Sequence, residues 1–72
     1  MKYQIKIEGM SCKHCLKRVQ EALLENFKPQ NLDVSLEENA AIMEVQAALE
    51  KQRIIDVIDD AGYDVLSIEI LD

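Results

Sequence analysis

The sequence predicts an α+β fold in which a four-stranded antiparallel sheet carries two helices on one of its faces. Four short stretches alternate apolar and polar residues, and two longer stretches repeat apolar residues every three or four positions. Their order along the chain is strand, helix, strand, strand, helix, strand. With 72 residues, 49% of them apolar and 31% charged, the chain is expected to form one small globular domain over residues 1–72.

The first half of the chain supplies one strand and one helix. Apolar residues alternate with polar ones at Tyr3, Ile5 and Ile7. A helix is expected from about Lys13 to Glu25, ended by Asn26 and Pro29. The apolar face of this helix consists of Leu16, Val19, Ala22 and Leu23.

The second half supplies a hairpin, a helix and a last strand. The hairpin alternates on both sides of Glu38-Asn39, through Leu32, Val34, Leu36, Ala41, Met43 and Val45. A helix is expected from about Leu49 to Ala61, capped by Gly62. The last strand is expected over residues 65–70, with Leu66, Ile68 and Ile70 on one face. This order is that of a ferredoxin-like βαββαβ sandwich, in which right-handed crossovers place both helices on the same face of the sheet.

Cys12 and Cys15 lie three positions apart where the first strand gives way to the first helix. The first-turn N–H groups of a helix lack internal partners and the helix dipole is positive there, so thiolates are favoured over thiols. Two thiolates at neutral pH form a pair of metal ligands. A structural role for the pair is the alternative.

The number of donors decides which metal fits. Zinc takes three or four protein ligands, whereas this chain has two cysteines and one histidine. Cu(I) is a soft ion that selects sulfur and is satisfied by two sulfurs in a near-linear arrangement. The pair therefore favours Cu(I), and the same count of donors also allows Hg(II).

Three further residues are expected at or below the same loop. Met10 is expected to fill the core beneath the cysteines, and a thioether ligand is the alternative. His14 is expected to point outward and to act near the metal without binding it; the alternatives are a direct ligand and a residue that is only solvated. Tyr63 follows the second helix at the same end of the fold, where it closes the core and points its hydroxyl at the site.

Charge and hydropathy restrict the partners. A net charge of −6 argues against binding to nucleic acid. No apolar run is long enough for membrane insertion, and the N-terminus lacks the apolar core of a signal peptide, so a cytoplasmic location is expected. Three basic residues, Lys13, Lys17 and Arg18, lie on the helix of Cys15. Four acidic residues gather on the second helix and the loop beside it: Asp56, Asp59, Asp60 and Asp64. These charges form either a docking surface or two solvated helix faces.

The segment Gly9-Met10-Ser11-Cys12-Lys13-His14-Cys15, with Ala61-Gly62-Tyr63-Asp64, resembles the heavy-metal-associated domain family, most closely its bacterial copper chaperones. The family's Met-x-Cys-x-x-Cys motif maps onto Met10, Cys12 and Cys15. The resemblance implies that the cysteines bind Cu(I) and pass it to a similar domain of a copper-transporting P-type ATPase. Other members bind zinc, cadmium or mercury, but Ser11, His14 and Tyr63 resemble the copper members. Phe27-Lys28-Pro29 departs from the family pattern, and the stretch after the third strand is about one residue short.

Three functions from different classes remain at this point. The first is a soluble Cu(I) carrier without enzymatic activity, monomeric without metal and able to dimerise by sharing copper. The second is a detached metal-binding domain of a transporter, although the closeness of Met1 to the first strand favours a complete small protein. The third is a thiol-disulfide oxidoreductase, which the strand order disfavours.

Overall fold

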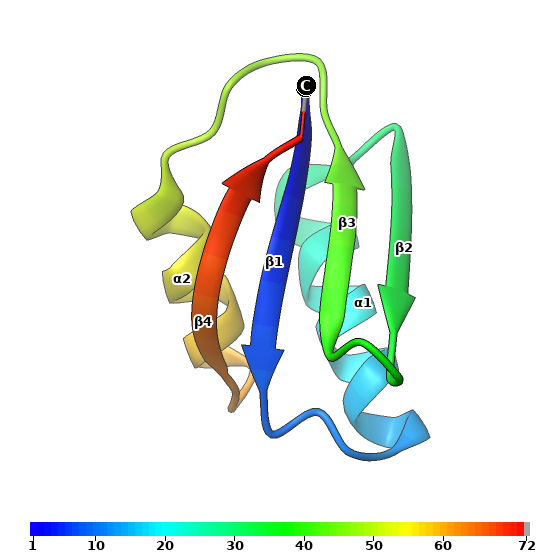
Figure 1. The fold of residues 1–72 in the computed structure, drawn as a ribbon. Coiled ribbons are helices and arrows are strands. Elements are labelled where there is room, and N and C mark those ends of the chain that lie inside the picture. The colour runs from blue at the N-terminus through cyan, green and yellow to red at the C-terminus, as the bar shows by residue number, and fades with distance from the viewer. Residues whose placement is uncertain (72) are drawn as a thin grey trace.

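The computed structural model describes residues 1–71 and has the predicted architecture. The elements are β1 (Lys2–Glu8), α1 (Lys13–Phe27), β2 (Asn31–Ser35), β3 (Ala40–Glu44), α2 (Lys51–Asp60) and β4 (Asp64–Ile70). The strands form one antiparallel sheet in the order β2-β3-β1-β4, and both helices cover the same face (Figure 1). The ferredoxin-like α+β fold is therefore confirmed.

Both helices differ at their ends from the sequence prediction. Helix α1 continues two residues beyond Glu25, because Asn26 stays helical and its side-chain amide donates to the Ala22 carbonyl at 2.8 Å. The helix ends where Lys28 adopts a left-handed conformation, with φ 45°. Helix α2 covers Lys51–Asp60, which is shorter than the expected range of residues 49–61.

The end of α2 is a Schellman motif, which fixes the path of the chain into β4. Gly62 has φ 100°, its N–H donates to the Asp59 carbonyl at 2.9 Å, and the Tyr63 N–H donates to the Ile58 carbonyl at 3.1 Å. The predicted role of Gly62 as a helix cap is confirmed. The cap sets the direction in which Tyr63 leaves the helix.

The predicted face of the last strand is wrong for Leu66. Ile68 lies opposite Ile5 and Val65 lies opposite Ile7, so three residues of β4 span the length of two residues of β1. The extra residue is a β-bulge, which interrupts the alternation of side chains. Val65 and Ile68 therefore both pack against the core, whereas Leu66 is 62% exposed.

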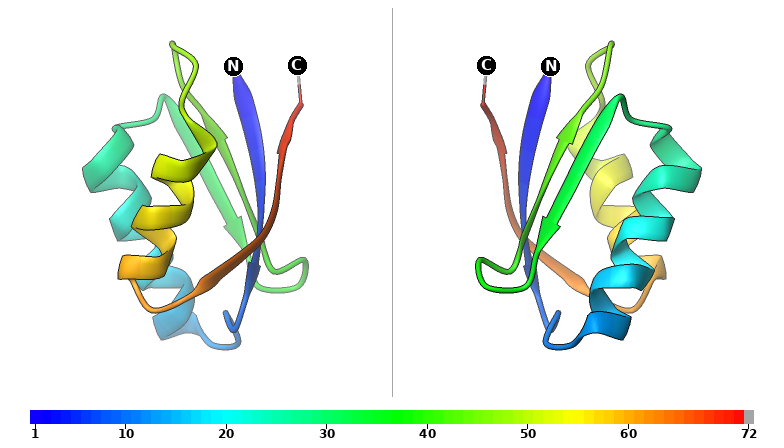
Figure 2. Two further views of the ribbon diagram at one scale, coloured as in Figure 1. Left: turned by 90° about the vertical axis from the view of Figure 1, so that its left-hand side faces the viewer. Right: turned by 90° about the vertical axis from the view of Figure 1, so that its right-hand side faces the viewer.

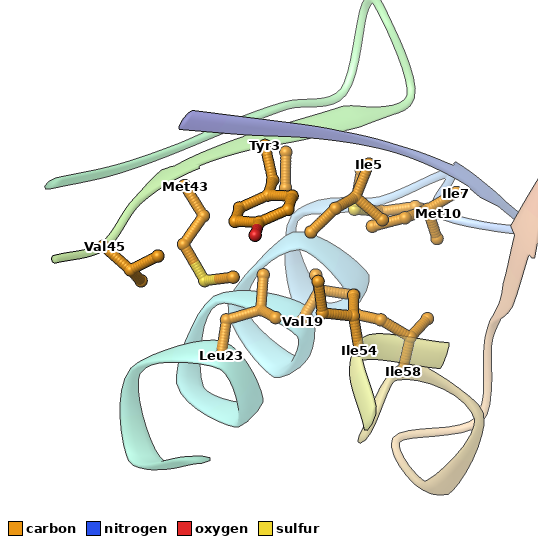
Figure 3. Packing of buried hydrophobic residues seen from close by; sticks show 11 residues of the cluster. Tyr3, Ile5, Ile7, Met10, Val19, Leu23, Met43, Val45, Ile54 and Ile58 are labelled. Atoms are coloured by element: carbon orange, nitrogen blue, oxygen red, sulfur yellow. The ribbon is translucent and has the colours of Figure 1, made fainter. Parts of the chain in front are cut away.

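The core lies between the sheet and the helices. Figure 3 shows β1 side chains facing those of α1 and α2. The buried members of the core include Tyr3, Ile5, Ile7, Met10, Val19, Leu23, Met43, Val45, Ile54 and Ile58. Tyr3 satisfies its buried hydroxyl by accepting the Leu49 N–H at 2.9 Å.

Three connections meet at one end of the molecule. The loop from β1 to α1, the β2–β3 turn and the α2–β4 connection lie together, while β1 begins and β4 ends at the opposite end (Figure 2). In the turn Asn39 adopts φ 51°, as its small polar side chain allows, and its carbonyl accepts the Ile7 N–H at 2.8 Å. The cysteine loop is thus attached to the hairpin on one side and lies beside Tyr63 on the other.

Candidate metal centre

Cys12 and Cys15 lie on the first turn of α1, where the sequence places them. Cys12 is the N-cap residue, with extended backbone angles, and Cys15 is the third residue of the helix. Their Sγ atoms are 3.1 Å apart, which is a hydrogen-bonding distance between a thiol and a thiolate. Both cysteines are free; Cys12 is exposed and Cys15 is half-buried.

The local backbone stabilises a negative charge on Cys15. As the third helical residue it occupies the position from which a side chain reaches back to the N-cap N–H, the place of the glutamate in a capping box. Hydrogen bonds from the backbone of Ser11 and Cys12 act on its sulfur in this way. The first turn of α1 contains no acidic residue, so a Cys15 thiolate supplies the negative charge that the helix dipole favours there.

Tyr63 has the largest effect on the acidity of Cys15. Its hydroxyl hydrogen-bonds to the Cys15 sulfur and, together with Cys12 and the backbone of Ser11, lowers the pKa of Cys15 to about 7. The same bond raises the pKa of Tyr63, because the hydroxyl must keep its proton in order to donate it. The prediction that Tyr63 lies beside the cysteines is confirmed. The lowered pKa of Cys15 favours its thiolate near neutral pH.

The two sulfurs lie closer together than a linear two-coordinate ion requires. A two-coordinate linear ion with bonds of about 2.3 Å requires sulfurs roughly 4.6 Å apart, so they must separate by more than 1 Å. The exposed side chain of Cys12 has room to turn outward once its contact with Cys15 is broken, while Cys15 is held by the contacts described above. The donor chemistry therefore fits a soft ion after one side-chain rotation.

Met10 and Gly9 form the base of the loop. Met10 is 1% exposed and belongs to the core, which confirms the prediction that it fills the space beneath the cysteines. Gly9 has φ 89°, a conformation that other residues rarely adopt. A Cβ at this position would lie 3.8 Å from the Tyr63 ring, so the ring packs directly against the glycine.

The remaining predicted residues lie around the rim. Ser11, Lys13, His14 and Lys17 are exposed, and the outward position of His14 is confirmed. Arg18 lies close enough to Tyr63 to counteract the rise in its pKa, and it also lines a groove of about 310 Å³ with Glu21, Glu25 and Asp60. The basic rim is therefore continuous with acidic groups where the two helices meet. Whether the rim docks a partner stays a prediction.

Two features of the site were not predicted from the sequence. The return of the Cys15 sulfur to the N-cap backbone was missed, although the position of Cys15 three residues after the N-cap indicates it. The bulge that turns Leu66 outward leaves no trace in the alternation pattern, because Leu66, Ile68 and Ile70 alternate perfectly.

The fold and the motif agree with a known family. The model of the heavy-metal-associated domain matches residues 4–64. This chain belongs to that family. A copper chaperone CopZ of Staphylococcus saprophyticus subsp. saprophyticus is 40% identical over 62 residues, 85% of this heavy-metal-associated domain and 91% of that protein. A copper binding domain from HMA7, a P-type ATPase, has a solved structure that matches with a TM-score of 0.74 and 30% identity, covering 99% of this chain and 93% of that one.

A second kind of relative is much longer than this chain. A mercuric reductase of Lysinibacillus sphaericus is 34% identical over 68 residues, which are 94% of this chain and 12% of that protein. Sequences similar to this chain thus make up nearly the whole of a small protein in one relative and a small part of a large protein in the other.

Two further features are absent from residues 1–71. No group of three or more His, Cys, Asp and Glu side chains is placed to hold a metal ion within this range. In the same part of the chain no helix combines the length and the apolar character needed to cross a membrane.

Proposed function

We propose that this domain is a cytoplasmic copper chaperone without enzymatic activity. It binds one Cu(I) between Cys12 and Cys15 and transfers it, by exchange of thiolate ligands, to a metal-binding domain of a copper-transporting P-type ATPase. The observation that carries the proposal is a pair of free thiols three positions apart at the N-terminus of α1. Free thiols at this distance suit the reducing cytoplasm.

The donor set favours Cu(I) over zinc. Two thiolates satisfy a soft monovalent ion, while zinc needs at least one further protein ligand in most sites. The complex of two thiolates with Cu(I) has one net negative charge, which the helix N-terminus and the Tyr63 hydroxyl stabilise. Similarity to the copper chaperone and to the copper-binding ATPase domain supports the same choice of metal.

The geometry also favours release to a partner. Cys12 is exposed, so an incoming thiolate reaches a metal held there without unfolding the domain. Ligand exchange then proceeds through a species in which sulfurs of both proteins hold the copper. The same exposure lets two copies of this chain share one copper, so a copper-bridged dimer is expected beside the metal-free monomer.

Hg(II) is the second candidate for the cargo. It is also soft and accepts two sulfurs in a line, and the similarity to a mercuric reductase favours it specifically. The acceptor would then be a different protein, while the roles of Cys12 and Cys15 would stay the same.

Direct transfer is tested by mixing the copper-loaded chain with the metal-binding domain of the copper-transporting ATPase from the same organism. The two proteins are separated by ion exchange, and the copper in each is measured over time. We expect copper to reach the ATPase domain much faster than it reaches a chelator held behind a dialysis membrane. Equal rates to both acceptors would mean that copper is released into solution first, and would contradict the proposal.

A further inference from the structure

A recess opens beside the metal-binding loop, between the end of β1, the β2–β3 turn and β4. It has a volume of about 400 Å³, and its apolar lining includes Ile7, Met10, Leu36 and Leu66. Ile7 and Met10 are buried members of the core, and Leu36 comes from the β2–β3 turn. Figure 2 shows that this turn extends away from the helices at the end of the molecule where the metal-binding loop lies.

Leu66 reaches this recess because of the bulge in β4. Without the bulge, regular alternation from Ile68, which lies opposite Ile5, would place Leu66 opposite Ile7 and turn its side chain toward the core. The bulge instead leaves it 62% exposed, the highest exposure among the large hydrophobic residues of the described chain. Bulges are common beside functional sites, where they redirect a side chain.

The recess and the metal-binding loop share their backbone. Gly9, Met10 and Ser11 line the recess and lead directly into Cys12. A protein that brings its own sulfurs to a metal on Cys12 must therefore cover the edge of the recess. The occupant is thus defined by the transfer reaction, on which this inference rests.

The charges beside the recess indicate what accompanies the apolar contact. Glu8 lines the recess and is paired with Asp64 across β1 and β4, so two exposed carboxylates lie side by side. Like charges directly opposite each other in a sheet repel. A basic side chain of the partner would relieve this repulsion, while the α1 rim with Lys13 and Lys17 attracts acidic groups.

We propose that this recess is the apolar anchor of the transfer complex, and that it takes an apolar side chain, flanked by a basic one, from the ATPase domain that receives the copper. The basic side chains of Lys13 and Lys17 on α1 steer the encounter through charge, and the recess holds the complex by burying Leu66. The two contributions differ in their response to salt, because screening weakens the first and leaves the second in place.

The test compares Leu66→Ser with Ile70→Ser in copper transfer to the ATPase domain from the same organism. Ile70 is a matched control, because it lies on the same strand, is 50% exposed and is about 13 Å farther along it. At 1 M salt we expect Leu66→Ser to lower the second-order transfer rate roughly tenfold, from the loss of one buried aliphatic side chain. Ile70→Ser is expected to match the wild type, and Cu(I) affinity against a chelator is expected to be equal in all three.

Methyl NMR of the wild-type protein gives a second measurement that needs no variant. Adding the ATPase domain should shift the methyl signals of Leu36 and Leu66 and leave those of Ile70 in place. Unchanged signals of Leu36 and Leu66, or equal transfer rates for Leu66→Ser and Ile70→Ser, would overturn the anchor while leaving direct transfer intact. If the wild type transferred no copper to the domain, the proposed function would fail, and the occupant proposed here with it.

Discussion

Replacing Tyr63 with phenylalanine tests the electrostatics of the site. The substitution removes one hydroxyl and keeps the ring that packs against Gly9. Four hydrogen bonds lower the pKa of Cys15 from 9.0 to about 7, and the bond from Tyr63 has the largest effect. Removal of the hydroxyl should therefore raise the pKa of Cys15 from about 7 toward its ordinary value of 9.0.

The assay is a pH titration of protein labelled with carbon-13 at the cysteine Cβ atoms, which reports each thiol separately. Tyr3→Phe is the matched control, because it removes a hydroxyl from the opposite part of the core, where Tyr3 accepts the Leu49 N–H. Tyr3→Phe should lower the free energy of unfolding by about 1 kcal/mol and leave the titration of Cys15 unchanged. An unchanged Cys15 titration in Tyr63→Phe would refute the assignment of the hydroxyl as the main cause.

The same substitution changes the pH dependence of stability. Because the pKa of Cys15 is lower in the folded protein than its ordinary value of 9.0, the thiolate stabilises the metal-free fold fully above pH 9. This stabilisation is lost as the pH falls toward about 7. Urea unfolding should therefore show the free energy of unfolding of the wild type rising between pH 7 and 9, with a smaller rise in Tyr63→Phe.

Three further substitutions separate packing, backbone and charge. Met10→Ala should cost about 2–5 kcal/mol in urea unfolding because it leaves a cavity in the core, while chelator competition gives near-native Cu(I) affinity; a loss of affinity with unchanged stability would make Met10 a ligand. Gly62→Ala should cost about 1–2 kcal/mol in thermal unfolding from backbone strain alone, since its Cβ would meet nothing within 4 Å; an unchanged melting temperature would contradict this reasoning. Lys17→Glu with Arg18→Glu should slow copper transfer in stopped-flow mixing and flatten its salt dependence, and equal rates at all salt concentrations would show that the rim is only solvated.

The fold was predictable because local patterns and topology agree. Alternation in the β1 and hairpin segments, helical spacing around Val19 and Ile54, and the order of the elements all specify the same sheet with two helices on one face. The position of Tyr63 beside Cys15 followed from this topology, because the loops after β1 and α2 lie at the same end. The burial of Met10 followed from its apolar side chain on a loop above the core.

The remaining features depend on contacts that local patterns do not record. The register of β4 is set by pairing with β1, and one inserted residue moved Leu66 out of the series formed with Ile68 and Ile70. The end of α1 moved because the Asn26 side chain bonds within the helix instead of capping it. The 3.1 Å contact between Cys12 and Cys15 depends on side-chain rotamers, which spacing alone does not determine.

Anaerobic titration of the protein with Cu(I), Zn(II) and Hg(II) under competing chelators, with X-ray absorption to count the bound sulfurs, tests whether Cys12 and Cys15 together bind Cu(I). We expect one Cu(I) per chain, held by two sulfurs in a nearly linear arrangement, with zinc bound far more weakly. Cys12→Ser and Cys15→Ser should each abolish tight binding. High Cu(I) affinity in the variant that lacks both cysteines would contradict the account, and so would a preference for Zn(II) over Cu(I) in the wild type.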